Sequence, residues 1–421
     1  MNRFILLTLG CILAAPAAAQ ERFVDVIVSL KDGGPATAHA ANSAAAQNVA
    51  VGLGLRPTHV YGAALTGFSA RVPEARLDAL ERHPRVLSVS MDGPMHIMQG
   101  NRPGGGGGGG STAQVVPWGV DRVGSQNNSN TGAGIDVYII DTGIDGNHAD
   151  LNVVGGYAVE SCKGGGCSAP WHDDHGHGTH VAGSAAALDN DRDVVGVAPG
   201  ANLYAVKVLS KRGSGSRSGV IAGVDWVAQQ AANSGHAVVA NMSLGGAGSK
   251  TGTCTSSGFS GTDDYHRAMC NAKNVGVVFV VAAGNEGANA TGSVPAAYDD
   301  AVITVSATSA ADDWTSWSNW GNGNASWTSN NSAPVAIAAP GASILSTRTG
   351  GGTTTMSGTS MSSPHVAGAA ALVLSSSPQS GSGSAFSNVR GILLQQAEST
   401  DGFSNTSGNP HAEDFLRASG L

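Results

Sequence analysis

The sequence predicts an α/β domain with a mostly parallel central sheet and helices on both faces, preceded by a small α+β domain. Apolar runs without alternation recur after residue 113, and buried parallel strands have this composition. Ala-rich helical stretches separate these runs, as in βαβ units. Seven glycines at 104–110 divide this region from a shorter one with its own strands and helices, and they read as a flexible linker.

The first 19 residues are predicted to be a signal peptide. Arg3 precedes an apolar run from Phe4 to Ala15, and residues 17–19 supply an A-x-A cleavage site. The run is too short to span a bilayer, and no later stretch suits a membrane helix. We therefore expect a secreted, extracellular protein without a membrane span. A lipoprotein signal ending at Cys11 is the alternative.

Residues 22–98 are expected to form the small α+β domain, and residues 99–112 the linker. The pattern predicts strands at 23–28, 67–72 and 86–89, with helices at 36–53 and 73–83.

Residues 113–421 are expected to form the large α/β domain. Its predicted strands are 135–140, 202–209, 237–242 and 275–283, and its predicted helices are 178–188, 219–232 and 360–374.

Charge and cysteine content restrict the partners and the compartment. The net charge of −8 is spread along the chain without a basic block, which argues against a nucleic-acid partner. Cys11 would leave with the signal peptide. The four remaining cysteines of an exported chain predict disulfides, and proximity favours Cys162–Cys167 and Cys254–Cys270 among three possible pairings.

Three polar segments lie where predicted elements end or begin. Asp141 follows the strand at 135–140, and ligands gather at the carboxyl ends of parallel strands. His177 precedes a helix. Ser360 opens the helix at 360–374, where free backbone N–H groups would face an oxyanion. Considered alone, Asp141 could instead be a turn or helix-capping residue, and Ser360 could be an N-cap residue.

The histidines between residues 172 and 180 leave a zinc site as an alternative. Four histidines lie there, but H-E-x-x-H is absent and the nearby cysteines are expected to be oxidised. We therefore do not favour a metal site.

In the order Asp, His, Ser, the motifs D-T-G-I-D, H-G-T-H-V-A-G and G-T-S-M-S-S-P-H-V-A-G resemble the active-site signatures of the subtilase family. The resemblance covers 113–421, and residues 22–97 resemble the family's inhibitory propeptide. It implies a serine endopeptidase in which Ser360 attacks the scissile carbonyl, His177 transfers protons and Asp141 orients His177. It also implies that Asn285, after Val281-Ala282-Ala283-Gly284, donates to the oxyanion.

The resemblance further implies how substrate binds. Two segments would pair with an extended peptide, and the S1 pocket would lie between residues 243–245 and 282–284. The candidate binding residues are Gly213, Ser214, Gly215, Ser243, Leu244, Gly245, Ala282, Ala283 and Gly284. Because strand pairing uses the backbone of the peptide and does not depend on its side chains, we expect broad specificity. The small apolar walls favour aliphatic or aromatic P1 residues.

A structural calcium ion is the one cofactor implied by the resemblance, in the loop 187–194. Its oxygen ligands would come from Gln114, Asp150, Asn190 and the carbonyls of Leu188, Arg192 and Val194. An Asx-rich turn without metal is the alternative. A second site is not expected, because Ala336 stands where related sequences carry an aspartate ligand.

The resemblance implies protein and peptide substrates, with the chain's own propeptide as an intramolecular inhibitor. Self-cleavage is expected between about Met98 and Ala113, and we expect a monomer.

Two other functions are open. A lipase or esterase would need G-x-S-x-G, which the segment around Ser360 lacks. A non-catalytic binding or adhesion protein on the same scaffold would have no need of the complete set of Asp, His, Ser and Asn residues.

Overall fold

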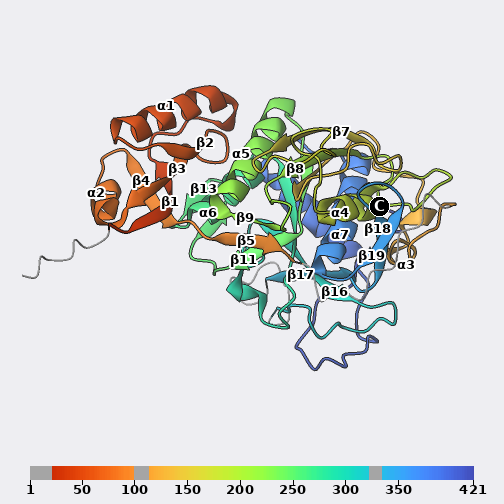
Figure 1. Ribbon diagram of the computed structural model, residues 1–421. Coiled ribbons are helices and arrows are strands. Elements are labelled where there is room, and N and C mark those ends of the chain that lie inside the picture. The colour runs from red at the N-terminus through yellow and green to blue at the C-terminus, as the bar shows by residue number, and fades with distance from the viewer. Residues whose placement is uncertain (1–20, 99–112, 322–333) are drawn as a thin grey trace, which may run out of the picture.

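The computed structural model describes residues 21–98, 113–321 and 334–421. The predicted signal peptide, with Cys11, and the predicted linker at 99–112 lie outside the described residues. Two bodies pack together: a small N-terminal domain and a larger α/β domain (Figure 1).

A seven-stranded sheet forms the centre of the large domain. The strand order is β17-β16-β14-β10-β6-β8-β7, and every neighbouring pair is parallel, which confirms the predicted fold class. The strands are β6 (Asp136–Asp141), β7 (Val153–Ala158), β8 (Asn202–Lys207), β10 (Val238–Met242), β14 (Val277–Ala282), β16 (Val302–Thr308) and β17 (Val335–Pro340).

Helices cover both faces of this sheet. Helices α4 and α7 bury their apolar residues against one face, with α3 and α8 beside them, whereas α5 and α6 pack on the other. The helices are α3 (Trp118–Val123), α4 (His177–Ala186), α5 (Arg217–Ser234), α6 (Asp264–Asn274), α7 (Thr359–Ser376) and α8 (Gly383–Gln396). Because β10 and β14 are apolar on both sides, they can be buried from both faces.

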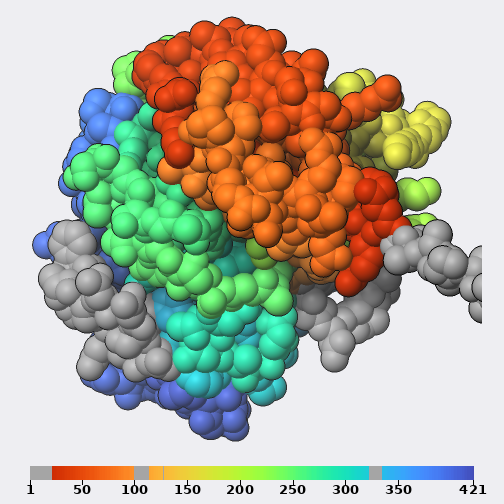
Figure 2. Space-filling view, turned by 90° about the vertical axis from the view of Figure 1, so that its left-hand side faces the viewer, coloured from red at the N-terminus to blue at the C-terminus, as the bar shows by residue number. Residues whose placement is uncertain are grey.

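The N-terminal domain is an antiparallel sheet, in the order β2-β3-β1-β4, with two helices on its outer face. Its elements are β1 (Phe23–Leu30), α1 (His39–Gly52), β2 (Pro57–Tyr61), β3 (Gly67–Pro73), α2 (Leu77–Glu81), β4 (Val86–Met91) and β5 (Pro94–Ile97). Val26 and Val28 point to the domain's own core, and Ile27 points to the large domain. In Figure 2 this red-to-orange domain covers the green part of the large domain.

Strand β5 leaves the N-terminal domain and enters the large one. It pairs antiparallel with β9 (Ser214–Ser216) on one side and β11 (Leu244–Ala247) on the other. The resulting small sheet has the order β15-β11-β5-β9 and includes β15 (Ser293–Val294). Among other elements, sequence reasoning missed β2 and β5, and β7, β16 and β17 of the central sheet.

Two hairpins lie outside the central sheet of the large domain. The short strands there are β12 (Thr253–Thr255), β13 (Gly258–Ser260), β18 (Ile344–Thr347) and β19 (Thr353–Met356).

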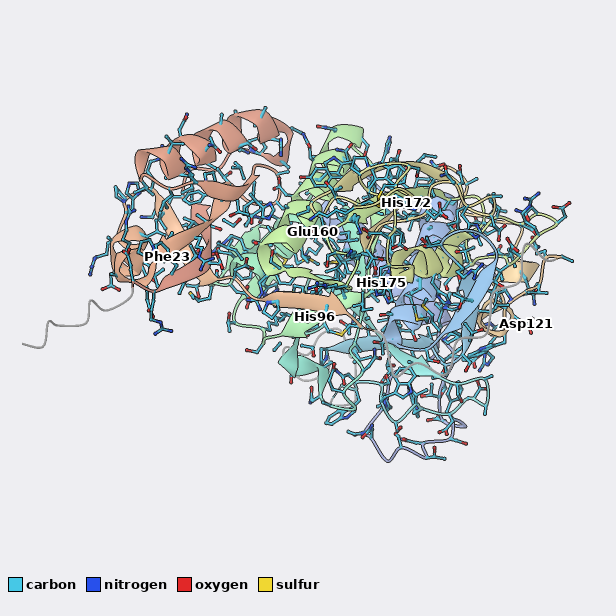
Figure 3. The ribbon with its side chains drawn as sticks, in the orientation of Figure 1. Phe23, His96, Asp121, Glu160, His172 and His175 are labelled. Atoms are coloured by element: carbon cyan, nitrogen blue, oxygen red, sulfur yellow. A yellow bond between two sulfur atoms is a disulfide. The ribbon has the colours of Figure 1, made fainter. Side chains whose placement is uncertain are left out.

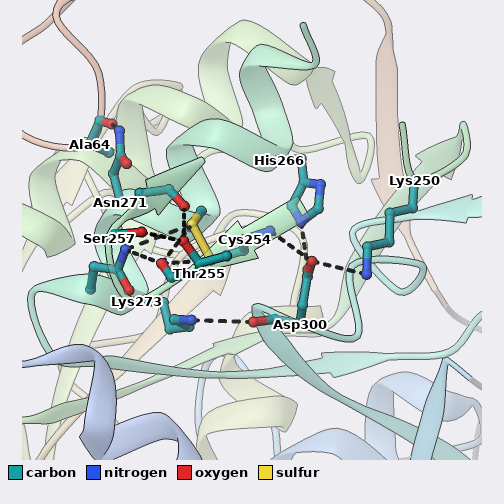
Figure 4. Close-up of a disulfide and its surroundings, with 12 residues drawn as sticks. Ala64, Lys250, Cys254, Thr255, Ser257, His266, Asn271, Lys273 and Asp300 are labelled. Carbon is teal, nitrogen blue, oxygen red and sulfur yellow. Dashed lines mark hydrogen bonds and ion pairs between the residues drawn. A yellow bond between two sulfur atoms is a disulfide. The ribbon is translucent and has the colours of Figure 1, made fainter. Parts of the chain in front are cut away.

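Disulfides join Cys162 to Cys167 and Cys254 to Cys270. Beside the second disulfide, Asp300 accepts from His266 and pairs with Lys250, which ties the loop 249–263 to the body (Figure 4). In the described part of the chain, no helix combines the length and apolarity needed to cross a bilayer.

Candidate active site

Asp141 and His177 meet at the carboxyl edge of the central sheet. Asp141 is the last residue of β6, and His177 is the first residue of α4, after Gly176 with a positive φ of 104°. Both side chains are fully buried, and His177 Nδ1 lies 2.8 Å from Asp141 Oδ1. Because an ionised carboxylate only accepts, Nδ1 carries the proton and Nε2 is left as the basic nitrogen.

Ser360 lies in the first turn of α7 and contacts the N-terminal domain. Its Oγ donates to the carbonyl oxygen of Met98 and lies 3.1 Å from the carbonyl oxygen of Ser243. Within the described residues, His177 Nε2 has no hydrogen-bond partner. The structure therefore joins Asp141 to His177, while the hydroxyl of Ser360 points to Met98 instead of His177.

The carbonyl oxygen of Met98 receives two more hydrogen bonds. Asn285 Nδ2 donates to it, and the backbone N–H of Ser360 donates over 3.3 Å. Thr359 orients the Asn285 amide, because its N and Oγ1 lie 2.9 and 3.1 Å from Asn285 Oδ1. Gly284 N donates to Thr359 Oγ1, so this hydroxyl can only donate to Asn285. Sequence reasoning missed Thr359, although it directly precedes Ser360.

The five residues before the linker lie extended across this site. In β5, Met95 pairs with Gly215 and Ile97 with Leu244. Two further backbone bonds continue the ladder, from Ile97 N to Gly213 O at 3.0 Å and from Met98 N to Ser243 O at 3.1 Å. The segments 213–215 and 243–245 therefore hold the chain's own residues 94–98 in an extended conformation.

The Met98 side chain fills a small pocket beside Gly245. A Cβ at Gly245 would lie 2.2 Å from Met98 Cε, so a larger residue at position 245 would force the end of the Met98 side chain to move. Ala282 is the last residue of β14, Ala282 and Ala283 are both buried, and Gly284 adopts a positive φ of 110° just before Asn285. Met95 is also fully buried, against the apolar residues of the large domain.

The remaining histidines of the cluster have other partners. His180 Nε2 lies 3.0 Å from the carbonyl oxygen of Ile344, and burial lowers the pKa of His180 to about 3. Burial and the neighbouring His177 lower the pKa of His175. Across 21–98, 113–321 and 334–421, no group of three or more His, Cys, Asp or Glu side chains could hold a metal ion.

A buried lysine links the segments that carry Asp141 and His177. Lys207 Nζ donates to the carbonyl oxygen of Thr142 at 2.5 Å and to Asp174 Oδ1 at 2.7 Å. The neighbouring Asp173 accepts from Thr142 Oγ1 and from the backbone N–H groups of residues 175, 176 and 179. These bonds fix the spacing of the two catalytic candidates. No local pattern in the sequence indicated the partners of Lys207.

Asp150, a predicted calcium ligand, is fully buried. Its carboxylate accepts from Asn190 Nδ2 at 2.8 Å and from Val194 N at 3.1 Å. Burial outweighs these bonds and raises the pKa of Asp150 to about 6. The loop thus contains a buried carboxyl group whose charge lacks compensation, and a cation would supply it.

Two other predicted ligands lie in the same loop, with their oxygens occupied by nearby N–H groups. Gln114 Oε1 accepts from Asn190 N at 2.6 Å, and Asn190 Oδ1 accepts from Arg192 N at 2.8 Å. Leu188 N donates to the backbone oxygen of Asp150 at 3.0 Å, which holds the start of the loop next to Asp150. The set is rich in oxygen donors and includes one carboxylate, so these residues fit a calcium ion.

The N-terminal domain also contacts the large domain away from Ser360. Asp264, at the start of α6, accepts from Ser29 Oγ at 2.7 Å and from Ser88 and Ser90 Oγ at 2.5 Å each. Asp225, in α5, accepts from the backbone N–H groups of residues 62–64. Two carboxylates of the large domain therefore bind the N-terminal domain.

Comparisons with known proteins were made for the whole chain. A family model described as subtilase family matches residues 132–415, and one described as peptidase inhibitor I9 matches 25–98. Subtilisin DY of Bacillus licheniformis is 41% identical over 274 residues, which is 63% of this chain and 87% of that protein. Subtilisin E of Bacillus subtilis (strain 168) is 37% identical over 316 residues, covering 74% of this chain and 71% of that protein.

A solved structure of a cold adapted subtilisin-like serine proteinase also matches. It has a TM-score of 0.57 and 35% sequence identity, and the match covers 73% of this chain and 99% of that chain.

Proposed function

Because this chain belongs to the subtilase family of serine peptidases and carries a peptidase inhibitor I9 domain, we propose that it is a secreted endopeptidase precursor that cleaves itself after Met98. The observation that supports this proposal is the position of the Met98 carbonyl, which receives hydrogen bonds from Ser360 N, Ser360 Oγ and Asn285 Nδ2. Residues 94–98 then occupy the cleft as the product of that cleavage.

We propose a role for each group. Ser360 Oγ attacks the scissile carbonyl carbon, while His177 Nε2 accepts the hydroxyl proton and later gives it to the leaving amine. Asp141 holds the Nδ1–H tautomer and stabilises the imidazolium. The oxyanion forms between Asn285 Nδ2 and the backbone N–H of Ser360, which are already aimed at one oxygen.

The bound segment also supports a preference at P1. Met98 is almost buried, and the end of its side chain lies beside Gly245, which has no side chain of its own. We propose broad specificity with apolar or aromatic P1 residues. Backbone pairing along residues 213–215 and 243–245 would supply most of the affinity, since it is independent of side chain.

We propose a structural calcium ion in the loop around Asp150. Gln114, Asp150, Asn190 and the carbonyls of residues 188, 192 and 194 would hold it. Its chemistry there is charge compensation, because a hard cation suits an oxygen-rich loop with a buried carboxylate.

Self-processing is tested with the full precursor and its Ser360→Ala variant. The parent should split between residues 98 and 99, as read by intact mass and N-terminal sequencing, and Ser360→Ala should stay whole. Ser362→Ala is the matched control, because Ser362 lies in the same helix without a hydrogen-bond partner among the described residues. A Ser360→Ala precursor that splits in isolation would contradict the proposal. A new N-terminus at Ala113 would show a second cut.

A digest of a denatured protein, with and without a serine-directed inhibitor, tests the peptidase activity itself. Labelling of Ser360 by a fluorophosphonate is expected, and its absence would favour a binding protein on this scaffold.

A further inference from the structure

The direction of the bound segment locates the other half of the substrate site. Residues 94–98 enter between β9 and β11 and end with the Met98 carbonyl at Ser360. His177 must reach the amine nitrogen that leaves this carbonyl. The substrate chain after the scissile bond therefore runs past His177 and away from residues 94–98. A site for that part of a substrate must therefore begin beside His177.

A cavity of about 470 Å³ lies next to His177, because its lining includes His175 and Gly176, the two residues before His177. One wall comes from the segment 162–176, which includes the Cys162–Cys167 disulfide and ends one residue before His177. The opposite wall comes from Arg348 and Met356, on the hairpin that leads to Ser360. Figure 3 labels His172 and His175, which line the cavity, and His96 on β5.

The negative charges of this cavity are already engaged. Asp173 is fully buried and accepts from Thr142, Thr179 and several backbone N–H groups. Asp174 pairs with the buried Lys207 at 2.7 Å and accepts from Lys163 N at 3.2 Å. Burial opposes ionisation of Asp174, but these hydrogen bonds outweigh it and lower its pKa.

The positive charges of the cavity are available. Arg348 Nε donates to the carbonyl oxygen of Gly351 at 3.1 Å, which fixes the half-buried guanidinium at the wall. Among the residues that the structure describes, no carboxylate forms an ion pair with Arg348 or with the Lys163 side chain. The net charge offered to a ligand is therefore positive.

We propose that this cavity binds the substrate residues that follow the scissile bond, and that Arg348 selects an acidic side chain there. A planar guanidinium is suited to a carboxylate, and Met356 and the disulfide pack against the methylene groups of a glutamate. This inference rests on the proposed peptidase function and adds a substrate class to it.

The test uses the processed enzyme and quenched fluorescent peptides. Each peptide carries Pro-Met-His-Ile-Met before the scissile bond, as in residues 94–98, and three residues after it. Those three are all alanine in the reference, and glutamate or glutamine replaces each in turn. At one of the three positions, kcat/KM should be about five times higher for glutamate than for glutamine, the size expected of a partly exposed ion pair.

Arg348→Gln should bring this ratio to about one and leave kcat/KM for the all-alanine peptide within twofold. Arg348→Lys should keep part of the preference, since the charge remains. Arg417→Gln, an exposed cation outside the cavity, should leave the ratio unchanged. Salt at 0.5 M should reduce the parent ratio through screening.

Equal cleavage of the glutamate and glutamine peptides at all three positions overturns the inference while the all-alanine peptide still reports the peptidase. A preference that survives Arg348→Gln also overturns it. If no peptide is cleaved at all, the proposed function itself is wrong.

Discussion

Replacing Asp264 with alanine should weaken inhibition by the N-terminal domain without affecting catalysis. Asp264 is fully buried at the start of α6 and accepts hydrogen bonds from Ser29, Ser88 and Ser90. With alanine at position 264, these hydroxyls lose their acceptor in the docked state. An unpaired buried hydroxyl costs about 1 to 3 kcal/mol.

Ser29 and Ser88 are both buried, so about 1 kcal/mol for each gives about 2 kcal/mol in all. This corresponds to a rise of about 30-fold in the inhibition constant, since 1.4 kcal/mol is tenfold. Asp264→Asn should lose less than tenfold. The asparagine keeps an oxygen that can accept a hydrogen bond. In addition, burial raises the pKa of Asp264, which shows that burying its negative charge costs free energy, so the charge itself opposes docking.

The assay measures the inhibition constant of a separate 22–98 polypeptide against the processed enzyme and its two Asp264 variants. That polypeptide has its own apolar core. The kcat/KM for a peptide substrate should be equal in all three, because Asp264 lies outside the cleft. Asp401→Asn, exposed near the C-terminus, is the matched control.

A change below threefold for Asp264→Ala would refute the reasoning. Equal losses for Ala and Asn would show that charge, rather than the hydroxyl acceptor, dominates.

Three other outcomes are expected. Gly245→Val would place side-chain atoms where Met98 Cε lies. The ratio of kcat/KM for a methionine P1 substrate to that for an alanine P1 substrate should therefore fall more than tenfold. An equal loss for both substrates would contradict the position of the P1 side chain beside Gly245. The hydrogen bond to Asp225 raises the pKa of His39 above 6.5, so docking should weaken as pH rises through that raised value; an inhibition-constant profile unchanged by His39→Gln would refute this. Chelation should lower the thermal midpoint of the inactive serine variant by about 5 °C or more, and Asp150→Asn should remove this response; an unchanged midpoint would exclude a bound calcium ion.

The fold was predictable because its elements carry strong local patterns. The apolar runs at β10 and β14 predicted buried parallel strands, and α7 was expected from its Ala-rich stretch. Strand β5 was missed because Pro94–Ile97 has only four residues and begins with a proline. It becomes a strand through its partners on both sides, which are more than 100 residues away.

The site was predictable where chemistry and motif coincide, as at Asp141 and His177. The orienting and docking contacts were not predictable from the residues alone. Thr359 acts through the amide of Asn285, and Lys207 through a carbonyl group and Asp174. Asp264 binds serines that lie 174 to 235 positions away, a relation that no local pattern encodes.

The place of β5 between β9 and β11 has a consequence for which proteins can be degraded. When β5 departs, it leaves a slot one strand wide, bordered by hydrogen-bonding groups on both sides. Only a segment of about five residues whose own backbone hydrogen bonds are broken can enter such a slot. Tightly folded proteins, including other copies of this enzyme, should thus resist attack until they open locally, and their rate of digestion should follow their own unfolding equilibrium.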